Sequence, residues 1–117
     1  MDESILRTVR NVLIGNNDDT SFDNELILNI NLALNTLTQI GVGNKDGFII
    51  TGENEKWTDF FTEQKLDMIK QYVVLKVRML FDPPSNSFVH TAFSEQIKEL
   101  EWRINIEVDD QTAKRGG

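Results

Sequence analysis

The sequence contains no cysteine, and this absence removes several kinds of chemistry at once. Without thiols, the chain can form no disulfide framework, no zinc knuckle and no thiol nucleophile. Its single histidine, His90, is too little to build a metal cluster or a nucleophile and base pair. We interpret His90 as a surface or partner-facing side chain. We therefore expect no catalytic residue, no cofactor, no metal site and no enzymatic activity.

Long apolar runs and an excess of positive charge are missing as well. No stretch approaches the roughly 18 apolar residues that span a bilayer, and the acidic start does not resemble a signal peptide. We therefore expect a soluble, unprocessed protein with no membrane contact. The formal net charge of -7 disfavours direct DNA binding, because phosphate contacts require Lys and Arg. An acidic surface instead suits a protein that lines a path through which DNA slides.

Proline and glycine are scarce, with two prolines and seven glycines that cluster between periodic stretches. This composition favours a folded chain over a disordered or repetitive one. At 117 residues with 39% hydrophobic content, the chain can bury one modest core but not two. We predict a single helical domain over residues 1–108 and a flexible, polar C-terminal tail over residues 109–117.

Hydrophobic periodicity predicts an all-α fold, a small four-helix domain. The first helix covers residues 3–13 and turns Arg7 and Arg10 away from its apolar side. The second starts near Phe22 after a capping box of Thr20 and Asp23, and it ends at residue 40 before a glycine. Residues 41–56 lose the periodicity, and β-branched character at 48–51 predicts a long structured loop that could include a short β ribbon.

The third helix, residues 63–81, is apolar almost all round and is therefore predicted to be the central, buried element. Thr62 can cap its start, and Pro83 and Pro84 end it. The fourth helix covers residues 86–107, with Glu99 and Arg103 placed to pair at i,i+4. Its predicted core stripe consists of Val89, Phe93, Ile97, Leu100 and Ile104.

Several large apolar residues lie off these core stripes and need a second surface to cover them. Leu28 and Leu32 fall on the polar side of the second helix. Phe88, Trp102 and Ile106 are displaced by about half a turn from the stripe of the fourth helix. Two explanations are open for this second group: the 41–61 loop folds over it within the monomer, or a neighbouring subunit covers it.

The candidate interface residues are therefore Leu28, Leu32, Phe88, Trp102 and Ile106. The loop before the third helix is a candidate partner segment, through Phe48, Ile49, Ile50 and Trp57. Other features have simpler interpretations. Gly41, Gly43 and Gly47 fit turns and not a phosphate loop, because no Lys-Ser or Lys-Thr step follows them. The row Asn31, Asn35 and Gln39 is expected to be a solvated helix face.

Segments over most of the chain carry a family resemblance, of which the most specific is Tyr72-Val73-x-Leu75-Lys76-Val77-Arg78-x-Leu80-Phe81-Asp82-Pro83-Pro84. The others are Leu6-x-x-Val9-Arg10, Phe22-Asp23-x-Glu25-Leu26-Ile27, Ile30-Asn31-x-Ala33-Leu34, Gln39-Ile40-Gly41-Val42-Gly43, Trp57-x-x-Phe60 and Glu99-Leu100-Glu101-Trp102-Arg103. In these segments the chain resembles the head-tail connector family of long-tailed bacteriophages, also described as adaptor or head completion proteins. The resemblance is particularly to members from phages of Gram-positive hosts.

This resemblance implies a structural virion protein at the head-tail interface, assembled in the cytoplasm of the host bacterium. It implies a homo-oligomeric ring with the symmetry of the portal protein, expected to be dodecameric, that docks beneath the portal. The ring would continue the DNA channel without sequence-specific DNA binding and would offer a surface to a tail-side stopper or tail completion protein. No catalytic residues come with the resemblance.

Two competing interpretations stay open. A small acidic helical regulatory or inhibitor module would bind a basic protein partner in a salt-sensitive way. A small enzyme would have to work with carboxylates alone, and the chain shows no sign of the cleft and shifted pKa values that this requires.

Overall fold

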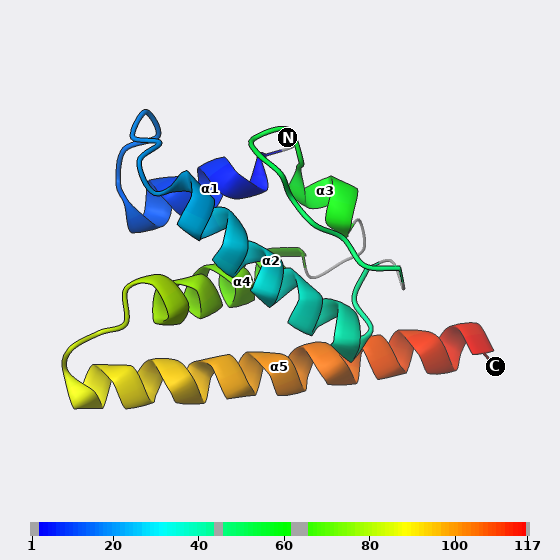
Figure 1. Cartoon of the computed structure of the whole chain (residues 1–117). Coiled ribbons are helices and arrows are strands. Elements are labelled where there is room, and N and C mark those ends of the chain that lie inside the picture. The colour runs from blue at the N-terminus through cyan, green and yellow to red at the C-terminus, as the bar shows by residue number, and fades with distance from the viewer. Residues whose placement is uncertain (1–2, 44–45, 62–65, 117) are drawn as a thin grey trace.

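A computed structural model of the chain describes residues 3–43, 46–61 and 66–116. It confirms the all-α class, with five helices in the described residues: α1 (Ile5–Leu13), α2 (Asp23–Ile40), α3 (Trp57–Phe60), α4 (Leu66–Phe81) and α5 (Ser87–Gly116). α2, α4 and α5 form the body of the molecule, and α1 and α3 cover one side of it (Figure 1). The single turn α3 was not predicted as a helix.

α4 is the central element, as its nearly continuous apolar character predicted. It packs against both α2 and α5 and buries Ile69, Tyr72, Val73 and Val77 between them. The Tyr72 hydroxyl keeps a partner in this core, because it donates to Glu101 Oε2 at 2.7 Å. Burial and this bond to a carboxylate raise the pKa of Tyr72 well above its usual value.

The prediction for the C-terminal end of α2 is confirmed, and the prediction for its N-terminal end is not. Gly41 follows its last residue with a left-handed φ of 114°, and the Gly41 N–H donates to the Leu37 and Thr38 carbonyls, so the predicted C-terminal glycine is confirmed. The predicted capping box is wrong. The N-cap residue is Phe22 and not Thr20, and it makes no side-chain hydrogen bond to the helix. The Asp23 carboxylate, which the capping box would need, accepts from Arg10 instead. The predicted Thr62 cap of α4 lies outside the described residues.

α5 runs the length of the molecule, since 30 helical residues at about 1.5 Å each span nearly the longest dimension of 48 Å. Asn86 caps it, accepting from the Phe88 N–H at 2.8 Å. The predicted end at residue 107 is wrong, since the helix continues to Gly116. Neither proline nor glycine interrupts residues 108–115. The flexible tail and the domain boundary at 108 stay predictions.

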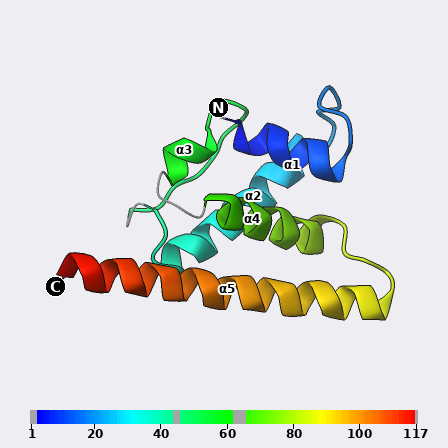
Figure 2. The same ribbon diagram turned by 180° about the vertical axis from the view of Figure 1, so that it is seen from behind.

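Among the α5 side chains that the structure describes, residues 87–108, those in the core lie between Ile97 and Ile104. Ile97, Leu100 and Ile104 are buried, whereas Phe93 is half-buried and Val89 is exposed, so the first turns of the helix lie outside the core. Both ends extend beyond α2 and α4, in front and back views alike (Figure 2). The predicted pair of Glu99 and Arg103 is present at 2.8 Å.

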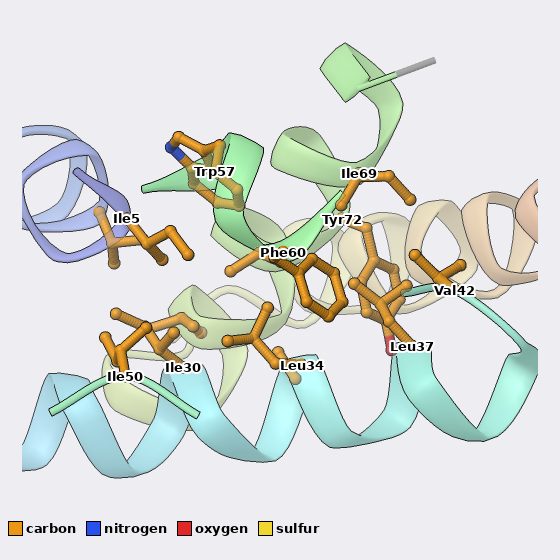
Figure 3. Packing of buried hydrophobic residues seen from close by; sticks show 14 of the residues in the cluster. Ile5, Ile30, Leu34, Leu37, Val42, Ile50, Trp57, Phe60, Ile69 and Tyr72 are labelled. Atoms are coloured by element: carbon orange, nitrogen blue, oxygen red, sulfur yellow. The ribbon is translucent and has the colours of Figure 1, made fainter. Parts of the chain in front are cut away.

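The loop before α3 folds into the core without making a β ribbon. In its described residues, 46–56, the one backbone bridge joins Lys56 to Ser4 at the start of α1. Ile50, Trp57 and Phe60 enter the same apolar cluster as Ile5, Ile30 and Leu34 (Figure 3). The β-branched residues of this segment, Ile49, Ile50 and Thr51, pair with no second strand in the described residues, and Ile50 is a core residue.

Candidate interaction surfaces

A buried arginine fixes the loops that surround the α1 and α2 side of the molecule. Arg10 is 0% exposed, and its guanidinium donates to Asp23 Oδ1 at 3.0 Å and Oδ2 at 2.7 Å. It also pairs with Glu53 at 2.8 Å and donates to the Asn17 carbonyl at 2.9 Å. One side chain therefore joins α1, the turn before α2 and the loop before α3. The bidentate geometry is the one that guanidinium and carboxylate groups prefer.

The pKa values in this cluster follow the charges. The bond to Asp23 raises the pKa of Arg10, and the bond from Arg10 lowers the pKa of Glu53. The prediction that Arg10 points away from the apolar side of α1 is wrong. Arg10 lies one turn after buried Leu6, at the edge of the apolar stripe, and that spacing was the available signal. The same prediction holds for Arg7, which is half exposed.

A second polar anchor holds the loop against α2. The Asn31 side chain donates from Nδ2 to the Ile50 carbonyl at 3.1 Å, and its Oδ1 accepts from the Ile50 N–H at 2.8 Å. These two bonds satisfy the Ile50 backbone as a neighbouring strand would. Asn31 is therefore not part of a solvated face, whereas Asn35 and Gln39 are exposed as expected.

These anchors decide which predicted loop residues can meet a partner. Ile50 and Trp57 are buried, and the Trp57 Nε1–H donates to Thr8 Oγ1 at 3.0 Å, so neither presents a free surface. Phe48 packs on Phe60 with ring centroids 5.4 Å apart. Only Ile49 exposes a large apolar side chain from this segment. The candidate partner loop is therefore reduced to Ile49.

The candidate interface residues on the helices are all exposed in the single chain. Leu28 and Leu32 on α2 are 62% and 49% exposed, and they lie one turn apart. On α5, Phe88 is 85% and Trp102 64% exposed, and Ile106 on the same stripe is less exposed, at 39%. The explanation that the 41–61 loop covers this α5 group within the monomer is therefore wrong for its described residues. Whether a neighbouring subunit covers it stays a prediction.

The α5 surface has a regular composition. Phe88, Ala92, Glu95, Glu99, Trp102 and Ile106 follow one another at alternating spacings of four and three residues, so they form one straight stripe along the helix. Apolar residues occupy both ends of this stripe, and two carboxylates occupy its middle. Such a face can dock on a partner helix or groove, and it has no arrangement suited to bond-breaking chemistry.

The remaining candidates for chemistry are weak. His90 is exposed on the first turn of α5. No group of three or more metal-ligating side chains occurs in the described residues. An open polar groove of about 490 Å³ beside α1 is lined by Glu3, Arg7, Thr8 and Lys56 among others. Its one hydroxyl and carboxylate contact in the described residues joins Thr8 Oγ1 to Glu3 Oε2 at 3.2 Å on the exposed surface. The side chains that stand out are those of interaction surfaces.

Within the described part of the chain, no helix is both long and apolar enough to span a bilayer. Comparison with known families gives a match to the phage connector protein family over residues 5–111. The comparisons with curated proteins and with solved structures gave no match. The family match takes in α1 to α4 and most of α5, including both candidate interface helices. The chain therefore belongs to the phage connector protein family, whose role in the virion is structural.

Proposed function

We propose that this chain is the subunit of a head-tail connector ring that docks beneath the portal, continues the DNA channel and offers an attachment surface to the tail. The observation that carries the proposal is the exposed stripe of Phe88, Trp102 and Ile106 along a helix that runs the length of the subunit. Exposed aromatic residues of this size are unusual on a free surface and are enriched at protein interfaces.

The proposed ring uses different surfaces of each subunit. α2 exposes Leu28 and Leu32, and α5 exposes its own apolar stripe, so one molecule offers separate patches on separate helices. A closed ring is built from heterologous contacts of this kind, in which one patch of a subunit meets a different patch of the next. The portal's symmetry, expected to be twelvefold, would set the number of subunits.

Charge supports the proposed channel. A net charge of -7 repels phosphate, so DNA would pass such a ring without adhering to it. The portal on one side and a stopper or tail completion protein on the other are the proposed partners. The proposed site of assembly is the host bacterial cytoplasm, and the proposed final location is the head-tail interface.

The test is the mass of the protein alone and with the portal protein of the same phage. Light scattering and electron microscopy should show a ring, either free or bound to the portal and sharing its symmetry. A protein that stays monomeric or dimeric under both conditions would contradict the proposal. Salt-sensitive binding of such a monomer to a basic protein would instead support an acidic regulatory module.

A further inference from the structure

A groove between α4 and α5 has the properties of a socket for protein side chains. Its volume is about 280 Å³, and it is lined by Lys76, Met79 and Leu80 of α4 and by Ile97, Lys98 and Glu101 of α5, among others. The volume lies just below the range of about 300 to 1,000 Å³ that is usual for small-molecule sites. Met79, Leu80 and Ile97 give its walls an apolar part beside the charged side chains, and Leu80 is itself exposed. It therefore suits a few side chains of another protein better than a free ligand.

The charges around this groove are unusual for the molecule. Away from the groove, the Lys and Arg side chains that the structure describes on the helices already have partners. Those that pair with carboxylates are Arg7, Arg10, Lys70 and Arg103, and Arg78 donates to the Asp82 carbonyl. Lys76 and Lys98 make no ion pair within the described part of the chain. Both line the groove. Its one carboxylate, Glu101, accepts the Tyr72 hydroxyl, so the groove carries one positive charge in excess.

The exposed side of α2 has the complementary composition. Glu25, Leu28 and Leu32 follow one another at spacings of three and four residues, so they share one face of the helix. All three are exposed, and Glu25 makes no ion pair within the described residues. This face presents two leucines and one negative charge, against apolar walls and one excess positive charge in the groove.

The two surfaces can act at the same time. No α2 residue is among those that line the groove. α2 packs on α4 with its buried stripe, so its exposed face is turned away from α4, and α2 lies in front of α4 in Figure 1 and behind it in Figure 2. A contact between them must therefore join two subunits, and it can repeat around a ring.

We propose that the α4 and α5 groove of one subunit binds the Glu25, Leu28 and Leu32 face of α2 of the next subunit, with Lys98 or Lys76 pairing with Glu25. This inference rests on the proposed connector ring and specifies one of its interfaces. It leaves the Phe88, Trp102 and Ile106 stripe of α5 free to contact other partners in the assembly.

The first test is directional crosslinking, which the absence of cysteine makes clean. Leu28→Cys and Leu80→Cys variants are assembled as rings, alone or on the portal, separately and as a mixture, and then oxidised. Disulfide-linked dimers should form in the mixture and not in either variant alone. Rings that assemble from the mixture without crosslinking would overturn this inference while leaving the proposed function intact. Failure of the unmodified chain to form any ring would overturn both.

The second test is charge reversal. Lys98→Glu should raise the subunit concentration needed for ring assembly by about tenfold or more, because the reversed charge would face Glu25 across the contact. Adding Glu25→Lys should restore assembly to within about threefold of the unmodified protein. Lys56→Glu, an exposed reversal outside the groove, is the control and should have little effect. Equal effects of the Lys98 and Lys56 reversals, or no rescue by Glu25→Lys, would overturn the pairing.

Discussion

Arg7 and Arg10 show how much a residue's environment decides its role. They lie three residues apart on α1 and both contact Glu53, yet Arg7 pairs at 3.5 Å on the surface and Arg10 is buried in a network. Surface ion pairs contribute little, because water solvates both charges nearly as well as the partner does. A buried guanidinium without its carboxylates would instead be strongly unfavourable, so the network must form as a unit.

Arg10→Ala should therefore lower the free energy of unfolding by about 3 kcal/mol, at the low end for a broken buried pair because Asp23 and Glu53 are partly exposed. The matched control, Arg7→Ala, should lower it by less than about 0.5 kcal/mol. Urea unfolding followed by circular dichroism measures both. Similar losses for the two variants would show that the network around Arg10 does not stabilise the fold.

Acid should weaken the same network. Since the bond from Arg10 lowers the pKa of Glu53 in the folded state, Glu53 stabilises the protein above its unfolded pKa and loses this contribution as pH falls through the folded value. Glu53→Gln should be less stable than the unmodified protein at pH 7, and the difference should shrink below about pH 4.5. Urea unfolding across this range provides the measurement. A constant difference would show that Glu53 does not act through its charge.

At the scale of elements, the helices and the ends of α2 and α4 at Gly41 and Phe81 were predictable, whereas the start of α2 and the end of α5 were not. The apolar stripes of α2 and α4 identify their buried faces, since spacings of three and four residues bring side chains together on any helix. The ends depend on competition. Asp23 leaves the predicted capping box for Arg10, and α5 continues past residue 107 because no residue stops it.

The end of α2 illustrates a dependence on both local and distant structure. Gly41 has a φ of 114°, which L side chains rarely adopt, and an added Cβ would lie 2.8 Å from Val108 Cγ1 of α5. Gly41→Ala should therefore lower the melting temperature more than Gly47→Ala, because Gly47 has a similar φ of 90° but open space around it. The expected loss is about 1 kcal/mol for the backbone alone, with the clash in addition.

Thermal melting of Gly41→Ala, Gly47→Ala and Gly41→Ala combined with Val108→Ala separates these two causes. The combination should recover the part of the loss that is due to the clash. If Gly41→Ala and Gly47→Ala melt alike, α5 does not press against the end of α2 as described.

At the scale of the whole molecule, one helix serves two purposes. The buried stripe of α5 holds the fold through Ile97, Leu100 and Ile104, and the opposite stripe remains exposed along the same helix. In the proposed ring, the exposed stripe would supply aromatic anchors of the kind that carry most of the energy of an interface.

Trp102→Ala should therefore change the melting temperature only slightly but weaken assembly with ring neighbours or virion partners by about tenfold or more. His90→Gln, another exposed change on α5, should affect neither property. Light scattering and the composition of assembled particles, beside thermal melting, measure both. Strong destabilisation of the isolated Trp102→Ala chain with unchanged assembly would place Trp102 in the monomer core.

The sequence by itself determined the class of the fold, the central position of α4 and the apolar residues left over on α2 and α5. These follow from spacing along one helix, which is a local property of the chain. Only the tertiary structure decided that Arg10 is buried, that Asn31 bonds to the Ile50 backbone, that Ile50 and Trp57 belong to the core, and that the α5 stripe stays uncovered. The placement of Arg10, Asn31 and Trp57 depends on pairings between residues 13 to 49 positions apart, such as Arg10 with Asp23 and Trp57 with Thr8. Such pairings are set by how the helices pack, which the spacing within any one helix does not contain.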